Sequence, residues 1–185
     1  MNPGELLERS LAYALGSVAG VPPGSLGRGT PCAAWNLGEL LGHLDDSLDA
    51  LHEGLTGGRI GLFPGAGPGA DPACVFRRRA CVVLGAWAAG PPDRVLVAER
   101  PLDVGVLAAV GAVEIAVHGW DVARACGRSW PIPPALAAGL LPVAWQVVAD
   151  ADRGVRFGPP VDVPPWARPD DRLLGFLGRG DSFPG

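Results

Sequence analysis

Residues 104–126 read VGVLAAVGAVEIAVHGWDVARAC, and this stretch decides the fold. Between Val104 and Trp120 only Glu114 and His118 can carry a charge. A helix that is apolar on every face is typically buried on every face. The stretch therefore predicts a long buried helix over residues 103–126, which Gly127 ends.

The two ionisable residues of this predicted helix are four positions apart, so both project from the same helical face. Burying the Glu114 carboxylate costs several kcal/mol or more unless another group compensates its charge. A divalent metal compensates well, because it binds an ionised carboxylate and a neutral imidazole together. The alternatives are a buried hydrogen bond between Glu114 and His118, or an arginine partner for Glu114.

A metal site needs a further ligand, and the candidates are His43 and His52 on a second predicted helix. That helix covers residues 37–55 and carries leucines at a 3.6-residue period. Both histidines flank the leucine stripe, so the periodicity does not choose between them. His52 lies near the helix end beside Glu53, a position typical of a solvated histidine. His43 lies mid-helix, where a bundle is most enclosed.

Helical patterns dominate the rest of the chain, which predicts an all-α bundle of four main helices with additional short helices. Asn36, with Glu39 three positions on, forms a predicted capping box. The other predicted helices cover residues 4–19, 71–89, 133–150 and 170–177. Residues 94–98 are expected as a short strand or extended link, and residues 155–164 as a small extended C-terminal segment. The glycine-rich stretch 56–70 lacks the Gly-Lys-Ser/Thr ending of a phosphate loop.

Length, charge and composition limit the classes of partner that the protein is expected to bind. The 185 residues suit one metal-binding helical-bundle domain spanning 1–185. The formal charge of -4 comes from scattered groups without any lysine, which argues against nucleic acid. No uninterrupted apolar run reaches the roughly 18 residues of a membrane span, so a membrane partner is not expected. A small-molecule substrate is the expected partner, and pairing of two bundles through a helical face would give a homodimer.

Cysteine usage and the N-terminus predict a cytoplasmic protein. The cysteines are Cys32, Cys74, Cys81 and Cys126, and none forms a Cys-x-x-Cys pair. Reduced thiols of this kind are typical of the cytoplasm. The first residues, MNPGELLERS, lack the basic and apolar regions of a secretory signal.

Three segments resemble one known family. TPCAAWNLGELLGHL at 30–44, VEIAVHGWDVARACG at 113–127 and VDVPPWARPDDRLLGFLGR at 161–179 are similar to segments of the mycothiol-dependent maleylpyruvate isomerase-like family. That family belongs to the DinB-like metalloenzyme superfamily. The resemblance implies a DinB-like four-helix bundle with a metal bound by His43, Glu114 and His118. It thereby selects His43 over His52. Zinc suits this donor set, and nickel, iron and manganese are the alternatives.

Two further residues are candidate catalytic groups. Asp121 follows His118 by three positions on the same helical face, where it could orient the imidazole or meet the substrate. Its alternative role is a salt bridge with Arg124 or Arg128. Arg179 matches an arginine that ends the family's C-terminal segment, and it could hold an anion near the site. Its alternative role is that of a surface arginine.

The resemblance implies a metal-dependent enzyme that acts on a small metabolite. The implied chemistry is isomerisation, or S-transfer with a low-molecular-weight thiol such as mycothiol as cosubstrate. The chain is short compared with the named isomerase. We therefore expect rearrangement of another small metabolite as much as isomerisation of maleylpyruvate. The alternative from a different class is a non-catalytic metal- or ligand-binding bundle protein. The third hypothesis is a bundle without metal, in which Glu114 pairs with an arginine.

Overall fold

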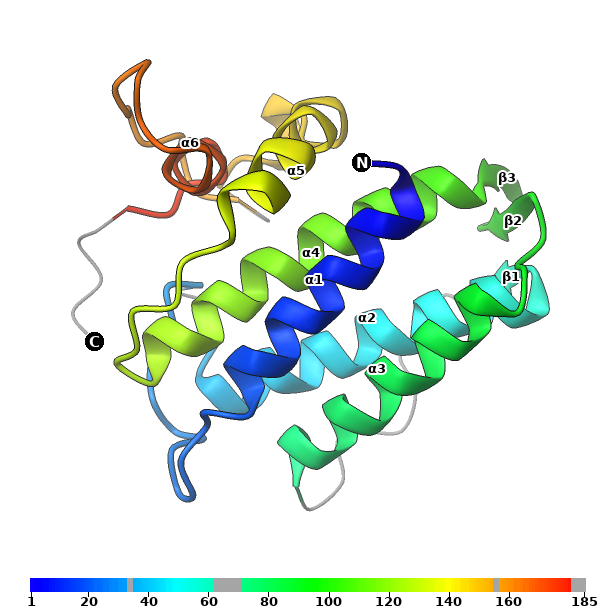
Figure 1. Ribbon diagram of the computed structural model, residues 1–185, viewed down its shortest axis with the longest axis horizontal. Helices are drawn as coiled ribbons and strands as arrows, with labels where there is room; N and C mark the ends of the chain where they lie inside the picture. Colours follow the sequence, from blue (N-terminus) through cyan, green and yellow to red (C-terminus); the bar gives the residue numbers. More distant parts are fainter. Residues whose placement is uncertain (33–34, 62–70, 155–156, 181–185) are drawn as a thin grey trace.

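The computed structural model describes residues 1–32, 35–61, 71–154 and 157–180. Its long helices form a four-helix bundle, as Figure 1 shows. These helices are α1 (Pro3–Val18), α2 (Leu37–Gly57), α3 (Pro72–Ala88) and α4 (Val104–Ala125). Two shorter helices, α5 (Pro134–Val147) and α6 (Pro169–Phe176), lie beside the bundle with a short 3-10 turn, η1 (Asp150–Asp152), between them in sequence. The predicted all-α fold is confirmed.

Each of the four long helices begins just after a residue whose side chain caps it. Asn36 accepts a hydrogen bond from the Glu39 backbone, and the Glu39 side chain accepts one from the Asn36 backbone. This reciprocal pair satisfies backbone donors that the first turn of a helix otherwise leaves open. Asp71 and Asp103 cap α3 and α4 without such a reciprocal bond: each carboxylate accepts hydrogen bonds from two backbone N–H groups of the first turn. The predicted capping box is confirmed.

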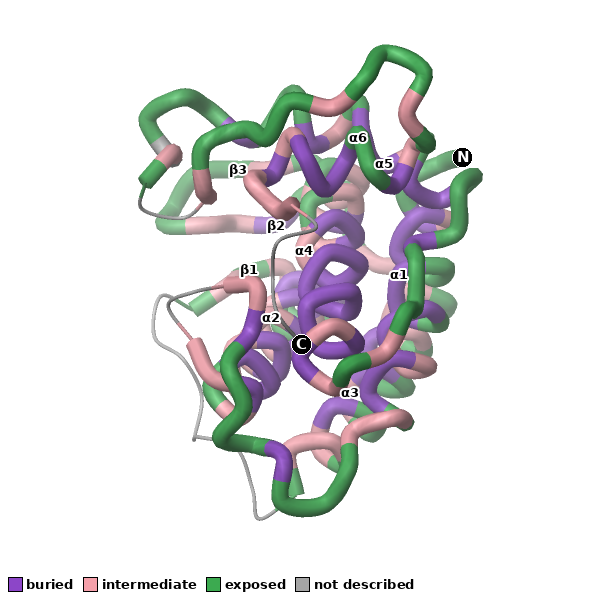
Figure 2. The backbone as a smooth tube through the Cα atoms, turned by 90° about the vertical axis from the view of Figure 1, so that its left-hand side faces the viewer, coloured by how far each residue is buried: buried purple, intermediate pink, exposed green. Residues whose placement is uncertain are grey.

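The bundle closes into a ring of helix contacts: α4 packs against α1 and α2, and α3 packs against the same two helices. Figure 2 shows the buried residues gathered along the inner faces of these helices. The contact between α1 and α4 is close at Gly119, where an added Cβ would lie 3.1 Å from both Cα and Cβ of Ala14. A glycine at this position thus lets the α4 backbone approach α1.

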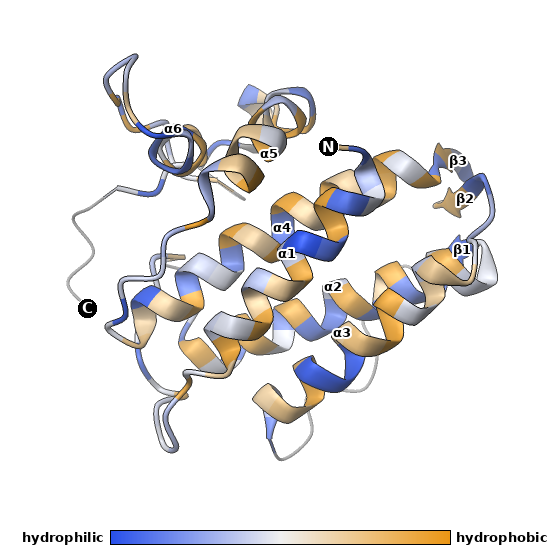
Figure 3. Ribbon diagram, viewed as in Figure 1, coloured by the Kyte–Doolittle hydropathy of each residue, from blue (hydrophilic) through white to orange (hydrophobic). Residues whose placement is uncertain are grey.

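Helix α4 is the central helix of the structure. The residue types that surround Glu114 and His118 are apolar, and Figure 3 shows the first part of α4 as a largely hydrophobic ribbon. By length and composition alone α4 could cross a membrane, but 72% of its most apolar window is buried inside the protein. The core helix of a bundle passes the same compositional test. The helix therefore places His118 in the protein interior and leaves Glu114 partly exposed.

A small sheet closes one end of the bundle. Its strands are β1 (Arg59–Ile60), β2 (Arg94–Val97) and β3 (Arg100–Asp103). β2 pairs in parallel with β1 and antiparallel with β3. Ala98 and Glu99 form the two-residue turn of the β2–β3 hairpin at positive φ, which is typical of the turns that match strand twist. Only the β2 strand had a counterpart among the expected elements.

One predicted helix is too long. The fifth helix, expected to reach residue 150, ends at Val147, because Val148 takes an extended conformation and the chain turns into η1. From residue 157 to residue 164 the described chain forms neither helix nor strand apart from a bridge between Phe157 and Arg153, so the extended C-terminal segment stays a prediction. Part of that segment, 155–156, and part of the glycine-rich stretch, 62–70, lie outside the described residues.

Candidate metal centre

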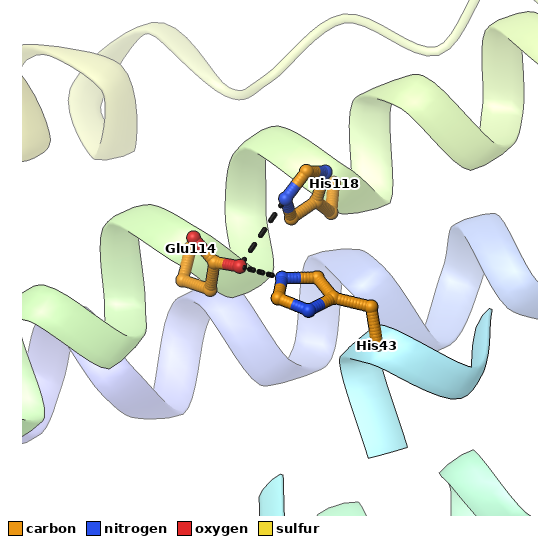
Figure 4. A group of neighbouring side chains, drawn as sticks. All are labelled: His43, Glu114 and His118. Carbon is orange, nitrogen blue, oxygen red and sulfur yellow. Dashed lines mark hydrogen bonds and ion pairs between the residues drawn. The ribbon is translucent and has the colours of Figure 1, made fainter. Parts of the chain in front are cut away.

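Three side chains from two helices meet at one point. The Nε2 atom of His43 on α2 lies 2.5 Å from Oε1 of Glu114 on α4. The Nε2 atom of His118, one turn further along α4, lies 3.2 Å from the same oxygen. Figure 4 shows both imidazoles pointing at the carboxylate. One donor atom from each residue lies within 4.8 Å of the others, and His52 is not part of this group.

The packing of α2 on α4 makes this convergence possible, and Trp35 supports it. The Trp35 ring stacks on the His43 imidazole with centroids 4.3 Å apart, and it lies 5.9 Å from the His118 ring. The two imidazoles are 5.2 Å apart at an interplanar angle of 87°. Trp35 also packs against the hydrophobic core, so it lies between the core and the site.

The charges at the centre are strongly coupled. Burial raises the pKa of the Glu114 carboxyl, but the positive charges and hydrogen bonds of His118 and His43 outweigh it and hold that pKa well below its usual range. Burial likewise lowers the pKa of His118, but the charge of Glu114 and the hydrogen bond to Asp121 raise it to about 9. The Glu114 carboxylate is therefore ionised, and protonated His118 supplies a compensating positive charge in the metal-free site.

Asp121 lies behind His118 and fixes its ring. The Nδ1–H of His118 donates to Oδ2 of Asp121 over 2.9 Å, which leaves Nε2 directed toward Glu114. The Asp121 side chain has no exposed surface. Although burial opposes it, the nearby Arg179 guanidinium and His118 hold the pKa of Asp121 below its usual range. This arrangement is the one that commonly orients metal-binding imidazoles.

Arg179 reaches the same carboxylate from the C-terminal segment. Its Nη2 donates to Oδ2 of Asp121 over 2.9 Å, and its Nη1 donates to the Leu177 carbonyl over 2.9 Å. The Arg179 side chain is only 7% exposed, so the expectation of a surface arginine is wrong. The structure thus brings Asp121 and Arg179 to the site, while a catalytic role for either stays a prediction.

A cavity of about 510 Å³ opens beside the three converging side chains. His43, Glu114, His118 and Arg179 line it, together with Cys32. Its other described walls are Trp35, Val110, Val113, Val117, Val147, Val148, Phe157 and Leu177. Sequence reasoning missed these apolar walls. Three of them, Val110, Val113 and Val117, share a face of α4 with Glu114 at helical spacing, which is the signal that could have revealed them.

The donor set fits a divalent metal. Two imidazole nitrogens and one carboxylate oxygen are the donors found in many catalytic zinc sites, which keep a further position open. Among the described residues only these three side chains form such a cluster, so the protein leaves room for a ligand from the cavity. The Nδ1–H of His118 is already engaged, which makes its Nε2 the available donor.

Comparisons with known proteins point to one family. A protein-family model described as "Mycothiol maleylpyruvate isomerase N-terminal domain" matches residues 7–123, a range that contains the three converging residues and Asp121. Two proteins of Mycobacterium tuberculosis strains, Uncharacterized protein MT0763 and Uncharacterized protein Rv0738, are each 28% identical over 171 residues. Each alignment covers 88% of this chain and 89% of the relative. No solved structure matches the chain.

Proposed function

Because the chain belongs to the mycothiol maleylpyruvate isomerase N-terminal domain family, and through it to the DinB-like superfamily, we propose that it is a metal-dependent enzyme acting on a small metabolite. In this proposal His43, Glu114 and His118 hold one divalent metal, with zinc as the native ion. The reaction is an isomerisation or an S-transfer that uses a low-molecular-weight thiol such as mycothiol. The site works in the cytoplasm.

One observation carries the proposal: the three donor atoms converge at the wall of a cavity large enough for a small molecule. The side chains of His43 and Glu114 keep 33% and 30% of their surface exposed, although both come from core helices. A structural metal site encloses its ion with protein ligands, whereas a catalytic site keeps one position open. The open side of this cluster favours the enzyme over a non-catalytic metal-binding protein.

The chain's own residues have separable roles. Glu114 supplies the negative charge, and His43 and His118 supply neutral imidazoles. Asp121 holds the His118 ring in one tautomer, and Arg179 keeps Asp121 ionised through its ion pair. A bound metal would act as a Lewis acid and lower the pKa of a thiol or water at the open position. The apolar walls of the cavity limit the access of bulk water to reacting groups.

The first test is elemental analysis of the purified protein. We expect about one divalent metal per chain in the wild type and almost none in His118→Ala, because two of three ligands bind zinc weakly. His52→Ala is the matched control, since His52 is also a histidine of α2 but lies outside the cluster. Equal metal content in all three proteins would refute the assignment of these ligands.

The second test is thiol chemistry. Metal-loaded and chelator-treated protein are incubated with mycothiol and a small electrophile, and thiol consumption is followed. The proposal expects consumption above the uncatalysed rate only in the metal-loaded sample. A metal-loaded protein that neither consumes the thiol nor changes its absorption spectrum with it would support the non-catalytic alternative.

A further inference from the structure

The walls of the cavity differ sharply from its metal-binding end. Helix α4 contributes Val110, Val113 and Val117, and the end of α5 contributes Val147 with Val148 just beyond it. Val113 and Val117 are almost fully buried, whereas Val110 and Val147 are both 37% exposed. The cavity therefore has an apolar rim and an apolar interior that lead to the polar cluster.

Two further apolar residues of the wall come from the C-terminal segment, beside Trp35 near the imidazoles. Phe157 and Leu177 both line the cavity, and Leu177 is fully buried. The carbonyl of Leu177 accepts a hydrogen bond from Arg179, so the wall and the ion pair behind His118 belong to one unit. A molecule in the cavity thus contacts hydrocarbon along most of its length.

The cationic side chain in this cavity is already neutralised. Among the described lining residues Arg179 is the only arginine, and its Nε and Nη2 face the two oxygens of Asp121 at 3.5 and 2.9 Å. Because Asp121 is fully buried, the pair cancels its own charge in the interior. Arg179 is therefore a poor anchor for a carboxylate of a ligand.

The remaining charge balance allows one negative charge on the ligand. A divalent metal carries two positive charges, Glu114 cancels one, and the two imidazoles bind in their neutral form. One positive charge remains at the polar end. A single anionic head group completes the balance, whereas a second anionic group would lie among valines without a partner, which is unfavourable.

We infer that the substrate of this site has one anionic, metal-binding head group and an uncharged, apolar body that lies along the valine wall. The inference rests on the proposed function, because it places the head group at the metal. A site of this kind does not suit a dicarboxylate such as maleylpyruvate, whose second carboxylate would have no partner. The substrate, as distinct from a polar thiol cosubstrate such as mycothiol, is an apolar monoacid or its equivalent of a size that fits about 510 Å³, and an apolar thiol serves as its probe.

The test uses the full chain loaded with Co²⁺ and two thiol probes. 2-Phenylethanethiol has an apolar body, and mercaptosuccinate carries two carboxylates. Binding of each is followed by the visible absorption of the cobalt centre. We expect a dissociation constant at least about tenfold lower for 2-phenylethanethiol. Equal binding, or tighter binding of mercaptosuccinate, would overturn the inference while leaving the metal site intact.

The two thiols also differ in their intrinsic affinity for cobalt, and a pair of variants controls for that difference. Val110→Arg places a cation at the rim of the cavity, and Val106→Arg places one a turn away on α4, exposed and outside the cavity lining. We expect Val110→Arg to shift the ratio of the two dissociation constants toward mercaptosuccinate by about tenfold, and Val106→Arg to leave it unchanged. An unchanged ratio in both variants would contradict the placement of the ligand body. A chain that takes up no cobalt would instead refute the proposed function itself, and this inference with it.

Discussion

His43 Nε2 and Glu114 Oε1 lie 2.5 Å apart although 71 positions separate the two residues in the chain. The contact joins α2 to α4 inside a protein whose other helix contacts are mostly apolar. Apolar side chains would fill this position at less cost, because a buried carboxylate and its partners must give up hydration. The contact is therefore expected to serve chemistry rather than stability.

Zinc should stabilise the wild-type protein and not His43→Ala. A metal that binds only the folded state stabilises it by about 2.7 kcal/mol at a hundredfold excess over the dissociation constant. For a chain of this length that corresponds to a rise in Tm of about 5–10 °C. Differential scanning calorimetry with and without zinc measures the shift. His52→Ala should show the wild-type rise, and a full rise in His43→Ala would argue against His43 as a ligand.

Asp121→Asn should weaken metal binding while leaving the ligands in place. The amide cannot provide the negative charge that orients and polarises His118 through its Nδ1–H. Loss of such a supporting group typically lowers metal affinity about 10- to 100-fold. Competition with a chromophoric chelator measures the affinity. An affinity equal to that of the wild type would show that Asp121 has no part in positioning His118.

Arg179→Met should destabilise the fold. It removes the guanidinium that pairs with fully buried Asp121, and breaking a buried ion pair from one side costs about 3–5 kcal/mol. Urea unfolding measures the loss. Arg172→Met is the matched control, because Arg172 is an exposed arginine of α6 in the same segment, and it should change stability by less than about 0.5 kcal/mol. Similar losses in both variants would mean that the ion pair contributes little.

The pH dependence of the metal-free protein should follow His118. Its folded pKa of about 9 lies above the ordinary value of 6.5, so the proton is held more tightly in the folded state. The stabilisation is fully present below pH 6.5 and is lost as the pH rises through about 9, a difference of about 3 kcal/mol. Denaturation of chelator-treated protein across this range measures the slope.

Metal binding should show the opposite trend, because the ion must displace the His118 proton. Zinc affinity is therefore expected to rise by about tenfold per pH unit up to about pH 9. A flat profile for zinc affinity, or a metal-free protein that gains stability between pH 6.5 and 9, would contradict the assigned protonation of His118.

Gly119→Ala should push α4 away from α1. The new Cβ would lie 3.1 Å from the backbone of Ala14, closer than ordinary contact, and overpacking of this kind costs about 1–3 kcal/mol. Gly85→Ala is the control, since an added Cβ there meets nothing within 4 Å on exposed α3. It should raise stability by up to about 1 kcal/mol. Thermal unfolding of both variants measures the contrast, and two stabilising substitutions would refute the close crossing.

Most of the helices could be predicted from the sequence because the signals that start a helix are local. Caps at Asn36 and Asp71 and the apolar run of residues 104–113 depend only on neighbouring residues, and the helix starts agree to within one residue. The end of the fifth helix was wrong because Val148 leaves the helix without a glycine or proline to signal it. The strand β1 was not predicted, since two residues carry too little pattern.

The candidate site likewise has residues that local spacing predicts and residues that only the packed fold brings together. Glu114 and His118 stand out on one helix, where spacing alone places them together. The choice of His43 over His52 needed the crossing of α2 and α4, which no local pattern encodes, and only the family resemblance supplied it. The ion pair of Arg179 with Asp121 spans 58 positions, and the apolar cavity walls come from four parts of the chain. Such long-range pairings follow from the packed fold.

The most direct test of the central claim is a crystal structure of the zinc-soaked protein with data collected on both sides of the zinc absorption edge. We predict one strong anomalous peak between Nε2 of His43, the carboxylate of Glu114 and Nε2 of His118, facing the cavity. A fully ordered site without such a peak, or zinc bound only at other residues, would contradict the claim that these three side chains form a metal centre.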